Sequence, residues 1–194
     1  VVKSVPIGGS AKFAILDTRI WQIAFDAMGN KVTTDTVTLS YMFSNCKNLT
    51  SVNMDVFMNV KPTTLNYFWR GCENMPTVEI DMMDLSELTT MDYCWSGCLM
   101  SSFTWHYITP KLTSIRGMFD SCKVLEILDL SQFIPVENVT YNLSDFVYYC
   151  LKLQTIIWPN HPWKVRSLRL AFMNVPMYTI DLSDLNPSKC NKHR

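Results

Sequence analysis

The chain has 194 residues, of which 48% are hydrophobic and 18% are charged, and its 17 Lys and Arg residues balance 17 Asp and Glu residues. Such a length allows either one compact domain or a short repeat protein of about six units. The balanced charge removes the usual reason to expect nucleic acid or an anionic membrane surface as a partner. No apolar run approaches the roughly 18 to 20 residues that a membrane helix needs, so we expect no membrane insertion.

The first 36 residues carry no copy of the repeat that fills the rest of the chain. Residues 12–16 and 20–25 have the apolar content of strands, and residues 26–30 have the composition of a turn. We expect residues 1–36 to cap a repeat array, because its first unit would otherwise expose its core. A fragment of a preceding domain is the alternative. The chain begins at Val1 rather than at Met, which indicates a processed or partial chain.

From residue 37 onward, one pattern of apolar residues recurs around a cysteine. Apolar residues lie three, four and seven positions before the cysteine, and three, six and eight positions after it. The third copy is one residue short after its cysteine, and a sixth copy has Asn174 in the cysteine position. Successive cysteines are 26, 26, 24 and 28 residues apart, a period typical of repeat architectures. The repeated cysteines are Cys46, Cys72, Cys98, Cys122 and Cys150.

Each copy combines two periodicities. The apolar positions before the cysteine share one helical face, which predicts a short helix or 3₁₀ turn. The positions six and eight residues after it alternate with polar residues, as in a half-buried strand. Stacking the copies would bury their apolar stripes and align the strands in parallel, roughly 4.8 Å apart. The sequence therefore predicts an α/β solenoid over residues 37–185, followed by a polar tail over residues 186–194.

A resemblance to a known family supports this interpretation. Residues 41–52 (YMFSNCKNLTSV) and 117–122 (GMFDSC) resemble the first half of the BspA-like leucine-rich repeats of bacterial and protist surface proteins, and residues 128–131 (LDLS) and 180–183 (IDLS) resemble the second half. The resemblance implies a leucine-rich-repeat solenoid of about six coils, with short parallel strands on one face and short helices or 3₁₀ turns on the other. It also implies an extracellular or cell-surface location and a role in adhesion or protein recognition. It brings no catalytic residues and no cofactor.

The strand half of each copy supplies the candidate binding residues. Side chains between two buried strand positions point outward, and here they form a polar, mildly acidic column that becomes apolar near Ile157. We expect this strand face to contact a partner, since solenoids present extended sheet faces. A solvated face without a partner is the alternative. The candidate residues are Asn53, Asp55, Glu79, Asp81, Thr104, His106, Asp129, Ile157 and Asp181.

Other site chemistries find little support. The repeated cysteines are expected to be small buried thiols. The Cα atoms of cysteines in neighbouring copies would be roughly 5 Å apart, which is also near the range of a disulfide. Cys94 and Cys98 are four residues apart rather than three, and no His lies at zinc-ligand spacing. There is no Asp-rich calcium loop, and a cysteine nucleophile paired with His106 lacks any recognisable motif. We therefore predict no catalytic residue, no metal and no cofactor.

Together these observations predict a non-enzymatic, surface-exposed binding or adhesion module. It would recognise a protein partner, on a host or another cell surface, with a glycan as the alternative ligand. The competing class is a structural or attachment subunit of a virion or filament, in which the solenoid continues into or packs on another chain at its ends. An enzyme is the third option. The aromatic and basic segment 158–169 is either a crossing loop or a further contact patch.

Overall fold

The computed structural model describes residues 4–5, 14–15, 36–58, 60–75, 78–161, 163–177, 179–183 and 185–186. The predicted cap, residues 1–36, lies outside this part of the chain, apart from Thr36 and one antiparallel pair, β1 (Ser4–Val5) with β2 (Ala14–Ile15). The predicted polar tail also lies outside it, apart from Asn186.

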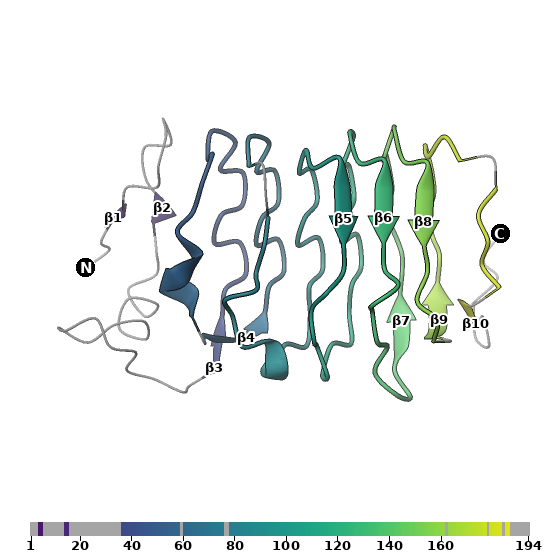
Figure 1. The fold of residues 1–194 in the computed structure, drawn as a ribbon, viewed down its shortest axis with the longest axis horizontal. Coiled ribbons are helices and arrows are strands. Elements are labelled where there is room, and N and C mark those ends of the chain that lie inside the picture. The colour runs from purple at the N-terminus through teal and green to yellow at the C-terminus, as the bar shows by residue number, and fades with distance from the viewer. Residues whose placement is uncertain are drawn as a thin grey trace.

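The remaining strands are short and pair in parallel with strands roughly one repeat further along the chain. Paired residues such as Ser102 and Ile127, or Ile127 and Thr155, mark neighbouring layers, which follow one another along the long axis of the molecule (Figure 1). The three parallel sheets have the strand orders β3–β4, β5–β6–β8 and β10–β9–β7. Their strands are β3 (Thr36–Thr38), β4 (Lys61–Thr64), β5 (Ser102–Thr104), β6 (Ile127–Asp129), β7 (Thr140–Asn142), β8 (Thr155–Ile157), β9 (Trp163–Ser167) and β10 (Leu185–Asn186).

The predicted α/β leucine-rich-repeat solenoid is wrong. The described residues contain no α-helix, and their helical structure is limited to two 3₁₀ helices, η1 (Met54–Phe57) and η2 (Leu85–Glu87). Their strands are divided among four small sheets of two or three strands, instead of forming one continuous sheet with helices behind it. The described part of the fold is therefore mostly turns and short strands.

The segment before each cysteine, where a short helix or 3₁₀ turn was predicted, forms consecutive turns. The N–H of Ser44 donates to the carbonyl of Tyr41 in its own turn, at 3.1 Å. The next N–H, that of Asn45, donates to the carbonyl of Arg70 in the neighbouring layer, at 2.6 Å. The residues five positions and one position before each repeated cysteine have positive φ, and such left-handed residues interrupt the right-handed backbone that a helix needs. These residues are Tyr41, Asn45, Tyr67, Gly71, Tyr93, Gly97, Gly117, Ser121, Asp145 and Tyr149.

The same turns correct the register of the last copy. Leu170 and Asn174 have φ of 57° and 60°, and they stand in the places of Tyr41 and Asn45 in the first copy. Val175 therefore occupies the cysteine position, and Asn174 precedes it by one residue.

One hydrophobic core joins the layers, and aromatic side chains and thiols pack in it beside many aliphatic residues. The ring of Phe43 stacks on Trp69 with centroids 4.7 Å apart, and Trp95 stacks on Phe119 at 5.6 Å. All four rings are at most 2% exposed. Full burial of one such side chain contributes about 1.5–3 kcal/mol, so these stacks are a main source of cohesion between layers.

The five repeated cysteines are free thiols, and four of them donate hydrogen bonds. The thiol of Cys72 donates to the carbonyl of Phe43 at 3.1 Å, and the same bond at 3.1 Å recurs from Cys98, Cys122 and Cys150. Burial raises the pKa of Cys72 and of Cys150 to about 12, so both thiols stay protonated at neutral pH. A protonated, buried thiol is a poor nucleophile, which is consistent with a packing role.

Candidate functional site

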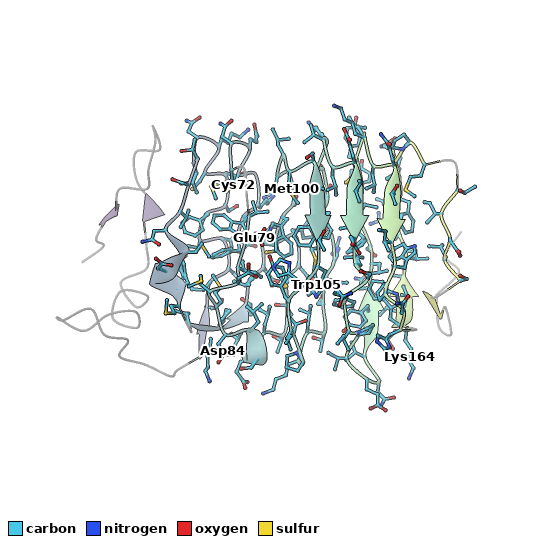
Figure 2. All side chains as sticks on the ribbon, in the orientation of Figure 1. Cys72, Glu79, Asp84, Met100, Trp105 and Lys164 are labelled. Carbon is cyan, nitrogen blue, oxygen red and sulfur yellow. The ribbon has the colours of Figure 1, made fainter. Side chains whose placement is uncertain are left out.

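Two neighbouring segments bring three of the predicted binding residues together. In residues 78–81 the side chains of Val78 and Ile80 are buried, so Glu79 and Asp81 point outward. In the second segment, burial of Trp105 directs His106 outward in the same way. Figure 2 labels Glu79 and Trp105, one on each segment.

The His106 ring lies against both carboxylates. Its Nε2 is 2.7 Å from Oδ1 of Asp81 and 3.6 Å from Oε2 of Glu79. Its Nδ1 is 3.0 Å from the carbonyl oxygen of Thr104. The three side chains are between 46% and 50% exposed, so this cluster is open to solvent and to a partner.

The electrostatics of the cluster favour a positive charge on the ring. Partial burial disfavours the imidazolium, but the hydrogen bond to the Thr104 carbonyl and the hydrogen bond and charge of Asp81 outweigh it. The charge of Glu79 acts in the same direction, and the pKa of His106 is raised above its ordinary value.

A buried tyrosine ties the cluster to the core. The hydroxyl of Tyr107 donates a 2.7 Å hydrogen bond to Oε2 of Glu79, while its ring stacks on Trp95 with centroids 6.1 Å apart. Trp105 holds the same segment, because its indole N–H donates to the Tyr107 carbonyl at 2.9 Å. Burial, followed by the hydrogen bond to Glu79 and its charge, raises the pKa of Tyr107. The hydroxyl therefore remains a donor and fixes the Glu79 carboxylate.

A shallow pocket of about 330 Å³ adjoins the ring of His106. Its wall includes η2 and Ile108, whose side chain is 82% exposed. An apolar side chain thus lies beside the acidic cluster. The lining residues are Asp81, Met83, Asp84, Leu85, Ser86, His106, Tyr107, Ile108 and Pro110.

Several other predicted binding residues form turns. The side chain of Asn53 caps η1 by accepting the backbone N–H of Asp55 at 3.0 Å. Asp129 and Asp181 likewise accept the backbone N–H two residues further on, each at 2.9 Å. The hydrogen bonds of Asp181 with Ser183 lower its pKa. Side chains engaged in this way stabilise the local turn, so their recurrence in the repeat has a structural cause.

Of the three remaining predicted residues, Asp55 is exposed but lies in η1 rather than on a strand. The other two, Thr104 and Ile157, lie on the sheet β5–β6–β8. They flank Asp129 in one row across the three strands, and both are exposed. A second exposed row contains Ile127, which sequence reasoning missed. The alternation of Leu128 with its neighbours would have indicated Ile127 as well, had the positions before the buried strand residue been considered.

A second polar cluster, on the turn side of the layers, was not predicted. The carboxylate of Asp145 accepts hydrogen bonds from the Tyr93 hydroxyl at 2.8 Å and from the Arg116 guanidinium at 2.9 and 3.2 Å. The Tyr93 ring ends a stack formed with Tyr67 and Tyr41, whose successive centroids are 5.1 and 4.6 Å apart. Tyrosines at 26-residue spacing were the only sequence signal for this stack.

No family model matches the chain, and no match was found among the curated proteins or the solved structures. The resemblance to BspA-like repeats therefore stays a prediction that depends on the quoted residues alone. None of the helices in the described residues has the length and apolar character required to cross a bilayer.

Proposed function

We propose that the chain is a non-enzymatic, cell-surface or extracellular module that binds a protein partner through the outward face of β5–β6–β8 and the adjoining cluster of Glu79, Asp81 and His106. The observation that carries the proposal is the exposure of two isoleucines on this short sheet. Ile127 is 46% exposed and Ile157 is 43% exposed, although Leu128, which follows Ile127 on β6, is fully buried. Exposed apolar side chains beside polar ones are typical of recognition surfaces.

The arrangement favours binding by rigid display. The side chains of Phe103 and Leu128 anchor β5 and β6 in the core, so the outward residues are held without help from a ligand. A pre-organised surface loses little conformational entropy on association. The carboxylates of Glu79 and Asp81 favour a partner that presents a basic group next to an apolar one.

The proposal is tested by binding of the labelled chain to intact cells, before and after protease treatment of the cell surface. We expect saturable, protease-sensitive binding that the double variant Ile127→Lys/Ile157→Lys abolishes. Ile134→Lys is the matched control, because Ile134 is 67% exposed and lies outside the sheet. Circular dichroism would verify that both variants fold.

Three outcomes would contradict the proposal. Binding that survives in the double variant would exclude this face, and binding that survives protease treatment would indicate a glycan ligand. Obligate assembly of the purified chain in analytical ultracentrifugation, without binding to cells, would favour the structural or attachment subunit.

A further inference from the structure

The cluster of Glu79, Asp81 and His106 has the donor set and spacing of a metal site. One oxygen from each carboxylate and one ring nitrogen all lie within 4.8 Å of one another. The two separations from Nε2, 2.7 and 3.6 Å, bracket the distance of about 3.3 Å between ligands of a tetrahedral zinc ion with bonds of about 2.0 Å. Small rotations of exposed side chains would equalise them.

The hydrogen bonds of His106 provide a second argument. Both ring nitrogens face hydrogen-bond acceptors, namely the Thr104 carbonyl and the carboxylate of Asp81. A neutral imidazole has a single N–H and cannot donate to both. When Nδ1–H donates to Thr104, the lone pair of Nε2 points at an anionic oxygen. At 2.7 Å that contact requires a proton between the two atoms. A metal ion with bonds of about 2.0 Å would replace this proton once the two atoms separate to about 3.3 Å.

The hydrogen-bond partners of the cluster also fit a metal site. Metal-bound histidines commonly donate their other N–H to a backbone carbonyl, and ligating carboxylates are themselves hydrogen-bonded. Here the Thr104 carbonyl and the Tyr107 hydroxyl would fill these two roles. The solvent exposure of the cluster leaves room for water in the remaining coordination position.

We propose that Glu79, Asp81 and His106 bind one divalent transition-metal ion, with Zn²⁺ as the best fit. A nitrogen ligand with two carboxylates suits zinc and its neighbours, whereas Ca²⁺ and Mg²⁺ prefer oxygen ligands alone. The inference goes beyond the proposed partner binding and does not depend on it. Asp81 and His106 are 25 residues apart in the sequence, so the site contains no short motif that would reveal it.

Isothermal titration of the EDTA-treated, dialysed chain with ZnCl₂ at pH 7.5 tests the proposal. We expect one bound ion per chain, and an affinity at least tenfold lower in His106→Ala and in Asp81→Asn. Tyr107→Phe should weaken binding by about tenfold, as loss of an outer-shell partner does. His161→Ala is the matched control and should bind as tightly as the original chain, because His161 is also exposed but lies outside the cluster.

Cobalt substitution supplies a readout that does not depend on affinity. The site should give the visible absorption of Co²⁺ with nitrogen and oxygen ligands, and His106→Ala should remove it while the far-ultraviolet circular dichroism stays unchanged. Absence of both zinc binding and the cobalt spectrum in the original chain would overturn the proposal. Equal zinc affinity in His106→Ala, or a cobalt–thiolate charge-transfer band, would also overturn it, because the ion would then be held by other residues.

Discussion

The hydroxyl of Tyr93 donates a 2.8 Å hydrogen bond to the carboxylate of Asp145, 52 residues further along the chain. The bond therefore spans two layers of the stack. Arg116, in the layer between them, donates to the same carboxylate. The side chain of Asp145 is only 13% exposed. Three successive layers thus share one nearly buried acceptor.

Replacing Asp145 with Asn should lower the free energy of unfolding by about 1–3 kcal/mol, since it removes the charge that Tyr93 and Arg116 share. Asn tolerates the positive φ of 61° at this position, so backbone strain does not contribute. Urea unfolding measures the effect. Glu87→Gln is the control: its pair with Lys111 is exposed, and its loss should cost less than about 1 kcal/mol. Equal losses in the two variants would show that Asp145 does not join the layers.

Replacing Gly117 with Ala should destabilise the protein more than replacing Gly97 with Ala. Both glycines have positive φ, 55° and 71°, so each substitution brings a backbone cost of about 1 kcal/mol. A Cβ on Gly117 would lie 2.2 Å from the Tyr93 ring, whereas a Cβ on Gly97 would meet nothing closer than 3.5 Å. Thermal unfolding should therefore show an additional loss of about 1–3 kcal/mol in Gly117→Ala. Tyr93→Ala has a cost of its own, because it removes the bond to Asp145. In that background Gly117→Ala should cost no more than Gly97→Ala; if it still costs more, the ring is not the cause.

The cysteine spacing predicted which residues of neighbouring copies pair, but not the backbone conformation within each copy. Neighbouring strands pair with offsets close to the repeat, as Ser102 with Ile127 does. The sequence predicted a short helix or 3₁₀ turn without deciding between them, because turns with bonds to the carbonyl three residues back place the same positions inward as a helical turn does. The decisive left-handed residues include Tyr41 and Tyr67, and bulky residues seldom adopt positive φ. Their conformation is set by the contacts of neighbouring layers, which one copy of the repeat does not reveal.

The candidate site was predictable in part. Period-two alternation placed Glu79, Asp81 and His106 outward, and the structure has all three exposed on one face. The hydrogen bond from Tyr107 to Glu79 could not be predicted. Tyr107 follows the outward-facing His106, so the alternation indicated only that its side chain lies in the core. The Asx turns were visible in principle: Asp-Leu-Ser occurs at residues 84–86, 129–131 and 181–183, always with the first side chain bonded to the N–H of the serine.

Acid should remove a contribution of Asp84 to stability. Hydrogen bonds from Ser86, together with Lys61 at 3.2 Å, lower the pKa of Asp84 to about 2. A depressed pKa stabilises the fold at any pH above the unfolded value of about 3.9, and this contribution disappears as the pH falls towards 2. Asp84→Asn keeps a side chain that can cap η2 but does not titrate.

We therefore expect the variant to be less stable than the original chain at pH 5, by no more than about 1 kcal/mol because the pair is partly solvent-screened. The two should converge as the pH falls from 4 to 2. Urea midpoints at several pH values measure the difference. A difference that stays constant over this range would mean that the Asp84 carboxyl has an unshifted pKa.

The stacked thiols should remain reduced and unreactive in the folded protein. Burial raises the pKa of the thiols at Cys72, Cys98, Cys122 and Cys150, and each donates a hydrogen bond to a carbonyl oxygen of the preceding layer. Thiol reagents attack the thiolate, so labelling at pH 8 should follow the rate of unfolding at these positions. Cys46 is only half-buried and should react first.

Mass spectrometry of the Cys190→Ser variant measures both properties, since that substitution removes the one cysteine outside the described residues. Alkylation in denaturant without a reductant should label all six remaining cysteines, because the structure has each as a free thiol. A brief pulse on the folded protein should label Cys46 alone. Two or more cysteines that stay unlabelled in denaturant until a reductant is added would show that neighbouring layers are joined by disulfides. The cohesion of the stack would then be covalent, and the thiol–carbonyl bonds would not exist in the oxidised protein.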